Sequence, residues 1–191
     1  MSLIVFMETD EGLILAGDSR LSRKTDPNWH RDDAEKVFAC INKVGIAYHG
    51  EADINGEPMG KIINDFILTV SQNDTIKNIL ANFQACIKAK GNPDSKFYIL
   101  GYENSEKRIY QFNVHDNTEE DWSDAVHGTG GRDEIAWPEL SGKFDIHKTN
   151  EEAIQLIHKL YQKTMDKIDS VGEPIDILFI SNNGTTWIEH K

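Results

Sequence analysis

The chain has 191 residues, of which 39% are hydrophobic and 27% charged, so residues 1–191 can bury a sizeable core as one domain. Its formal net charge is -12 and its basic residues are scattered, which argues against nucleic acid as a partner because such a field repels phosphate backbones. No segment approaches about 18 consecutive apolar residues, and the start lacks the basic region of a signal peptide. We therefore expect no membrane association and a cytoplasmic protein.

The first fifty residues predict two β-hairpins with a loop between them. Both hairpins consist of apolar runs that are nearly continuous, which is typical of strands covered on both faces. They are expected from Leu3–Met7 with Leu13–Ala16, and from Lys36–Ile41 with Val44–Tyr48 around the two-residue turn Asn42-Lys43. The polar, proline-containing stretch Arg20–Asp33 predicts a surface loop.

Helical periodicity follows the second hairpin. An apolar stripe at helical spacing includes Ile62, Ile63, Phe66, Ile67 and Val70. A second helix is expected after the capping residues Asp74-Thr75, through Ile76, Ile79, Leu80 and Phe83.

The second half repeats this alternation of strands and helices. Strands are expected at Phe97–Tyr102, at Arg108–Val114 and in a short segment that ends at Val126. A helix is expected at Arg132–Leu140, and a capping box at Thr149–Glu152 predicts another that reaches Tyr161. A closing hairpin is expected from Ile175–Ser181 and Thr185–Glu189 around Asn182-Asn183-Gly184.

The predicted order is ββββ, αα, βββ, αα, ββ. Runs of strands alternating with runs of helices favour antiparallel sheets with helices packed outside, rather than βαβ units. Two stacked sheets between two helix layers would bury both faces of every sheet, which explains the continuous apolar strands. The fold class expected is therefore α+β, a four-layer αββα sandwich.

Several polar or reactive residues predict structure rather than chemistry. Cys40 and Cys86 lie in separate apolar stretches, which favours buried free thiols over a disulfide or a metal pair. The stretch with His30, Asp32 and Asp33 is read as a solvated loop, and no metal or cofactor is expected. His127–Gly131 lacks the pattern of a phosphate-binding loop, so a turn is expected there.

Ser2 directly follows Met1, and its position gives it a chemical significance. Removal of Met1 would leave a hydroxyl and a free amine on one residue, which is a nucleophile with its own base attached. A serine after methionine is also common, so position alone does not decide between catalysis and chance.

Four motifs occur in the order and spacing of one family. Gly12–Arg20, GLILAGDSR, resembles the GVVLAADSR signature of proteasome β-type subunits and the related bacterial peptidase HslV. The second motif, Lys36-Val37-Phe38 followed by Gly45–Gly50, is similar to their K-I-F and GIAxSG segment. The third, His127–Gly131, resembles the GSGS element, and the fourth, Thr149–Leu156, resembles the helix that follows it. The resemblance covers essentially the whole chain and implies a proteasome-like N-terminal nucleophile (Ntn) hydrolase.

The resemblance assigns five site residues. It implies Ser2 as the nucleophile, Asp18 and Lys36 as the charged pair that activates it, Gly50 as the backbone oxyanion donor and Thr129 as a supporting hydroxyl. Asp18 and Lys36 taken singly are also explained as a turn residue and a solvated strand edge.

The sequence departs from the family pattern at three places. Serine replaces the threonine that the family uses as nucleophile. The family's supporting Asp and Ser fall, without gaps, on Ile168 and Val171, whereas a local slip places them on Asp169 and Ser170. Finally, a retained Met1 would acylate the amine of Ser2; a native protein that never matures and a vector-derived Met-Ser-Leu leader both remain open.

Three functions are carried forward. The first is hydrolysis of a peptide or other amide through Ser2, in a homo-oligomeric ring, with an ATPase unfoldase as a further partner that the resemblance implies. The second is a catalytically silent assembly or binding protein with the same fold. The third is a small-molecule amidohydrolase that does not form a ring.

Overall fold

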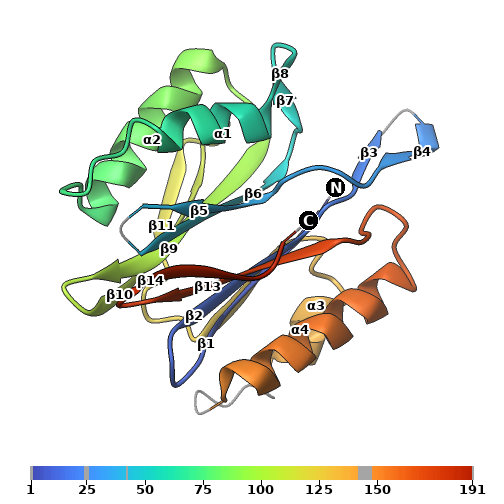
Figure 1. Ribbon diagram of the computed structural model, residues 1–191. Helices are drawn as coiled ribbons and strands as arrows, with labels where there is room; N and C mark the ends of the chain where they lie inside the picture. Colours follow the sequence, from blue (N-terminus) through green and yellow to red (C-terminus); the bar gives the residue numbers. More distant parts are fainter. Residues whose placement is uncertain (1, 24–25, 42, 142–147, 191) are drawn as a thin grey trace.

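Two five-stranded antiparallel sheets form the centre of the chain in the computed structural model, which describes residues 2–23, 26–41, 43–141 and 148–190 (Figure 1). The first sheet has the order β12-β1-β2-β13-β14. Its strands are β1 (Leu3–Glu8), β2 (Leu13–Asp18), β12 (His127–Gly131), β13 (Ile175–Ser181) and β14 (Gly184–Glu189).

The second five-stranded sheet has the order β11-β10-β9-β6-β5. Its strands are β5 (Val37–Cys40), β6 (Val44–Gly50), β9 (Ser95–Glu103), β10 (Glu106–Asn113) and β11 (Thr118–Asp121). Two short hairpins accompany the large sheets: β3 (Leu21–Arg23) with β4 (Asp26–Arg31), and β7 (Asp53–Ile54) with β8 (Glu57–Pro58).

The helices of the described residues lie in two pairs, on opposite sides of the sheets (Figure 1). The first pair is α1 (Met59–Ile67) and α2 (Ile76–Lys90), and the second is α3 (Ala136–Leu140) and α4 (Asn150–Met165). Thr75 caps the start of α2, because its hydroxyl accepts a hydrogen bond from the amide of Asn78. The expected capping box at Thr149 and Glu152 is confirmed at the start of α4.

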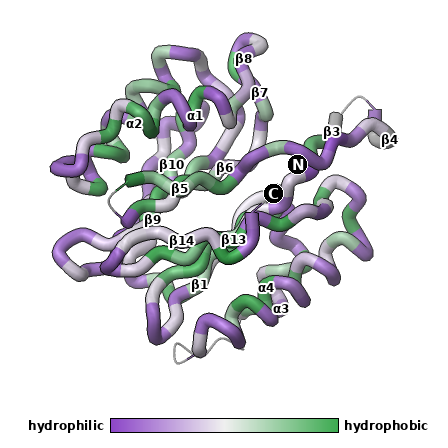
Figure 2. The backbone as a smooth tube through the Cα atoms, in the orientation of Figure 1, coloured by the Kyte–Doolittle hydropathy of each residue, from purple (hydrophilic) through white to green (hydrophobic). Residues whose placement is uncertain are grey.

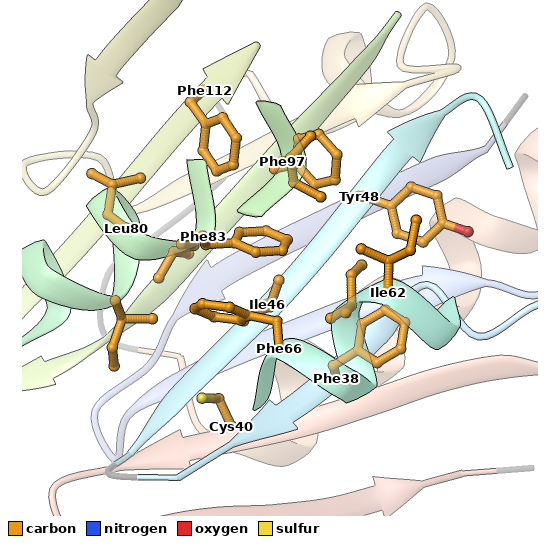
Figure 3. Packing of buried hydrophobic residues seen from close by; sticks show 14 of the residues in the cluster. Phe38, Cys40, Ile46, Tyr48, Ile62, Phe66, Leu80, Phe83, Phe97 and Phe112 are labelled. Atoms are coloured by element: carbon orange, nitrogen blue, oxygen red, sulfur yellow. The ribbon is translucent and has the colours of Figure 1, made fainter. Parts of the chain in front are cut away.

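The first pair of helices packs on the second sheet through an aromatic core. The ring of Phe83 in α2 meets Phe97 of β9 and Phe112 of β10 edge to face, with centroids 5.3 and 5.6 Å apart (Figure 3). Phe66 of α1 lies 4.8 Å from Phe83, so both helices share one cluster with the sheet. Such geometry is the favourable one for aromatic pairs.

The second pair of helices packs on the first sheet. Its cluster includes Ile157 and Tyr161 of α4 together with Leu3 and Val5 of β1. Hydrophobic and hydrophilic stretches alternate along the helices in Figure 2, as expected for helices with one face on a sheet.

A third cluster fills the space between the two sheets. It joins Ile4 and Leu15 of the first sheet to Ala47 and Leu100 of the second. Strands such as β1 and β2 are therefore buried on both faces, which is the physical reason for their continuous apolar sequence.

Two expectations for the strands were wrong. The stretch Arg20–Asp33 contains the hairpin β3-β4 instead of being a loop throughout. His127–Gly131 is a strand, not a turn, because it pairs with β1 over its whole length, from Leu3 opposite Gly131 to Met7 opposite His127. Glycine-rich polar sequence does not predict a strand, and here the partner β1 imposes the extended backbone.

Smaller differences concern ends and burial. Helix α1 ends before Val70, although Val70 still packs against the same cluster, and α3 begins at Ala136 rather than Arg132. Cys40 is buried as expected, whereas Cys86 is only partly buried. The expected turn residue Asn42 lies outside the described residues.

Candidate functional site

The backbone at the start of β1 is held on both sides of the peptide between Ser2 and Leu3. The carbonyl of Ser2 accepts the amide of Arg132 at 2.7 Å. The amide of Leu3 donates to Asp18 Oδ1 at 2.9 Å, and its carbonyl accepts the hydroxyl of Tyr161 at 2.8 Å. The side chains and backbone of three distant segments therefore fix the position of Ser2.

Asp18 and Lys36 form a buried ion pair beside this segment. Asp18 ends β2, Lys36 directly precedes β5, and Lys36 Nζ lies 3.0 Å from Asp18 Oδ2. Their side chains are 0% and 1% exposed. Lys36 also donates to the carbonyl of Arg20 at 2.5 Å. Burial with several hydrogen-bond partners is the arrangement in which such a pair stays charged.

The loop that precedes β13 completes the surroundings of Asp18. The amides of Arg20 and Gly172 donate to Asp18 Oδ2 at 3.1 and 3.4 Å. In the same loop, Ser170 Oγ is buried and has no hydrogen-bond partner among the described residues. A buried hydroxyl in that state is unusual, because desolvation is unfavourable unless a partner compensates it.

Gly50 lies at the end of β6, where only glycine fits. Its φ is +124°, a conformation that other residues rarely adopt, and an added Cβ would lie 2.4 Å from the carbonyl oxygen of Asp94. His49, the residue before it, is partly buried. Burial lowers the pKa of His49 to about 4, aided by the positive charges of Lys96 and Lys36.

Thr129 lies in the middle of β12, opposite Val5 of β1. Its hydroxyl donates to Asp133 Oδ2 at 3.5 Å, and the residue is 7% exposed. Thr129 is therefore two residues along the strand from Gly131, which pairs with Leu3.

The structure connects some of the five predicted residues by direct contacts and places the others only by their strands. Asp18 and Lys36 are joined by direct contact and linked to the start of β1, whereas Gly50 and Thr129 arrive on strands β6 and β12. Sequence reasoning missed Tyr161 and His49. The sequence places Tyr161 only on the apolar face of a helix, and nothing in it signals that the hydroxyl donates to the carbonyl of Leu3.

The stretch with His30, Asp32 and Asp33 is more ordered than a solvated loop. Arg20 donates to both carboxylate oxygens of Asp32, at 2.6 and 3.0 Å, and Arg31 pairs with Asp33. The hydrogen bonds from Arg20 lower the pKa of Asp32. Within the described ranges, no group of three His, Cys, Asp or Glu side chains is arranged to hold a metal ion.

Comparison with known proteins places the chain in a family. The model of the Proteasome subunit family matches residues 2–180, so the chain belongs to the proteasome subunit family. Among solved structures, the Anbu (Gly-1) mutant from Hyphomicrobium sp. strain MC1 is similar, with a TM-score of 0.80 and 16% identity over 100% of this chain and 87% of that chain.

A second similar structure is Anbu (ancestral beta-subunit) from Yersinia bercovieri, with a TM-score of 0.78 and 14% identity over 97% of this chain and 86% of that chain. At such identities the likeness concerns the fold. No curated protein sequence matches. A search of the helices in the described part of the chain found none long and apolar enough to cross a membrane.

Proposed function

We propose that the protein is an Ntn hydrolase of the four-layer αββα type that cleaves a peptide or related amide, with Ser2 as its nucleophile after removal of Met1. The observation that carries this proposal is the dual contact of Asp18. One carboxylate oxygen accepts the amide of Leu3, and the other lies 3.0 Å from Lys36 Nζ. A buried cation and its counter-ion are thereby held next to the residue that would react.

In the proposed reaction, Ser2 Oγ attacks the amide carbonyl and its own α-amine takes the proton, directly or through a water. A free α-amine has a reference pKa of about 8, close to the value a general base needs. The ammonium of Lys36 favours the ionised hydroxyl and the neutral amine. Asp18 keeps Lys36 charged and oriented.

The tetrahedral intermediate requires a donor for its oxyanion. We assign this role to the backbone amide of Gly50, where the absence of a side chain allows a substrate to approach closely. As the intermediate collapses, the α-ammonium of Ser2 gives its proton to the departing amine, and an ester remains on Ser2 that water then hydrolyses. Thr129 is assigned a supporting role on the neighbouring strand.

The α-amine also needs a partner. Asp169 and Ser170 each lie one residue from the ungapped family positions Ile168 and Val171, in opposite directions, so we assign the supporting roles to them through a local change of the loop. The buried hydroxyl of Ser170, which has no hydrogen-bond partner among the described residues, supports this assignment, since it lies in the loop whose Gly172 amide donates to Asp18. The alternatives Ile168 and Val171 have apolar side chains that offer no hydrogen bond.

Proteasome family members commonly form oligomeric rings, and we extend the proposal to a homo-oligomeric ring in the cytoplasm, with an ATPase unfoldase as a further partner. The acidic chain, with its net charge of -12, supports the absence of nucleic acid from the list of partners.

One observation favours a catalytically silent assembly protein as a second function. Ser2 is only 4% exposed, and its amine becomes free only if Met1 is removed. Light scattering separates both of these functions from the third, a small-molecule amidohydrolase, because a monomer at micromolar concentration is incompatible with a ring.

The test begins with the intact mass of protein isolated from its own host, which should lack Met1. Turnover of a panel of fluorogenic peptides is then measured for the wild type, Ser2→Ala, Ser2→Thr and Lys36→Met. We expect turnover to be lost in S2A and K36M and retained in S2T, which keeps the hydroxyl.

Lys107→Met is the matched control. Lys107 pairs with Glu8 and donates to the carbonyl of Ala125, so K107M removes another partly buried lysine that lies outside the proposed site. Retention of Met1 in the native protein, or turnover that persists in both S2A and K36M, contradicts the mechanism.

A further inference from the structure

We propose that His49 is a positioning residue: its imidazole lies between the two sheets and holds the strand end that carries Gly50 against the chain start that carries Ser2. The consequence for catalysis rests on the proposed function. The structural link itself does not.

The ring of His49 lies at the contact between the two sheets. His49 belongs to β6 of the second sheet, yet its ring lies against β12 of the first. A Cβ added to Gly130 would lie 3.0 Å from His49 Cδ2, and one added to Gly131 would lie 3.4 Å from His49 Cγ. The absence of a side chain at Gly130 thus leaves room for the imidazole, and Gly131 is at ordinary contact distance from it.

The contact between His49 and β12 lies next to the carbonyl of Ser2. Gly131 has a φ of +85°, and a Cβ added there would lie 1.9 Å from the carbonyl oxygen of Ser2. The next residue, Arg132, donates its amide to that same carbonyl at 2.7 Å. The position that a side chain at Gly131 would occupy is therefore bordered by both the carbonyl of Ser2 and the ring of His49.

The hydroxyl of Tyr98 helps to fix the ring of His49. His49 Nε2 lies 3.2 Å from the hydroxyl of Tyr98 in β9, within hydrogen-bond distance, and the two rings are 5.9 Å apart. Tyr98 is buried, and burial raises its pKa, so its hydroxyl stays protonated. The Tyr98 hydroxyl at Nε2 and the backbone of Gly130 and Gly131 along Cδ2 and Cγ together bound this edge of the ring.

His49 is poorly suited to act as an acid or a base. Burial lowers the pKa of His49 to about 4, the positive charges of Lys96, Lys36 and the chain's amino terminus act in the same direction, and the carboxylate of Asp94 acts against them. A neutral ring with so low a proton affinity is a poor base at neutral pH. It is well suited, however, to a rigid contact beside Lys36, where a second cation would be unfavourable.

The structural test uses amide hydrogen exchange by NMR on the full chain, in the wild type, His49→Ala, His49→Gln and Tyr98→Phe. In H49A we expect exchange of the Leu3 and Arg132 amides to accelerate about tenfold, because local opening becomes easier. The amides of Ala16 and Ile177 in the middle of the first sheet should not change.

H49Q should restore part of the protection, and Y98F, which removes one hydroxyl, should accelerate the same two amides to a smaller extent. Y98F and H49Q decide the matter if H49A does not fold. Unchanged exchange at Leu3 and Arg132, or equal acceleration at all amides, overturns the proposal. So does an imidazole that titrates near the unperturbed value of about 6.5 in the wild type.

A kinetic test applies to protein that hydrolyses the fluorogenic peptides. There we expect H49A to lower kcat about tenfold with little change in KM, since misplacement affects the reacting groups rather than substrate binding. A change in KM alone contradicts the role in catalysis. If the wild type shows no turnover, the proposed function fails, while the exchange experiment still decides whether His49 holds Ser2 in place.

Discussion

The ammonium nitrogen of Lys36 lies 3.0 Å from the carboxylate of Asp18, and both side chains are removed from water. Neither charge has solvent to stabilise it, so each depends on the other and on the surrounding amides. Removal of one partner leaves an uncompensated buried charge, which is far more destabilising than loss of an exposed pair.

Lys36→Met should therefore lower the free energy of unfolding by about 3–5 kcal/mol. The double variant D18N/K36M should be more stable than K36M, because asparagine still accepts the amide of Leu3 while no charge remains buried. Urea denaturation of the three proteins measures both differences. Equal effects of K36M and of the control K107M would show that the pair has no special importance.

Tyr161→Phe tests the contact between α4 and the start of β1. The change removes only the hydroxyl that donates to the carbonyl of Leu3, and leaves that buried acceptor without its partner. We expect the protein to lose about 1–3 kcal/mol of stability. Y110F, which removes the hydroxyl of a buried tyrosine of the second sheet, is the control; a similar loss in both variants would contradict a specific role.

Gly131→Ala and Gly56→Ala separate steric conflict from backbone strain. Both glycines have φ near +85°, but a Cβ would meet nothing within 4 Å at Gly56 and would lie 1.9 Å from the carbonyl oxygen of Ser2 at Gly131. G56A should destabilise by about 1 kcal/mol through strain alone. G131A should destabilise considerably more and should abolish turnover, as measured by thermal unfolding and peptide hydrolysis.

Asp32→Asn tests the link between Arg20 and hairpin β3-β4 through pH. The hydrogen bonds from Arg20 lower the pKa of Asp32, so this interaction stabilises the fold above the unfolded pKa of about 4. That stabilisation is lost as the pH falls through the lower folded value. The wild type should exceed D32N in urea midpoint at pH 7, and the difference should shrink below pH 4; a difference independent of pH contradicts the assignment.

Most strands and helices could be predicted because their signals are local. The apolar run Leu3–Met7, the stripe around Phe66 and the capping box at Thr149 each depend on residues that are near one another in the sequence. The strand β12 could not be predicted in this way. Its glycine-rich sequence has low strand propensity, and only pairing with β1 stabilises its extended conformation.

The candidate site shows the same difference between local sequence signals and contacts between distant segments. The sequence by itself determined the order and spacing of Ser2, Asp18, Lys36 and Gly50, since these are properties of motifs. Only the tertiary structure decided that Asp18 bridges Leu3 and Lys36, that Tyr161 holds Leu3 and that His49 reaches the opposite sheet. Such contacts join segments far apart in the chain, and a buried polar group finds its partner only when packing excludes water from both.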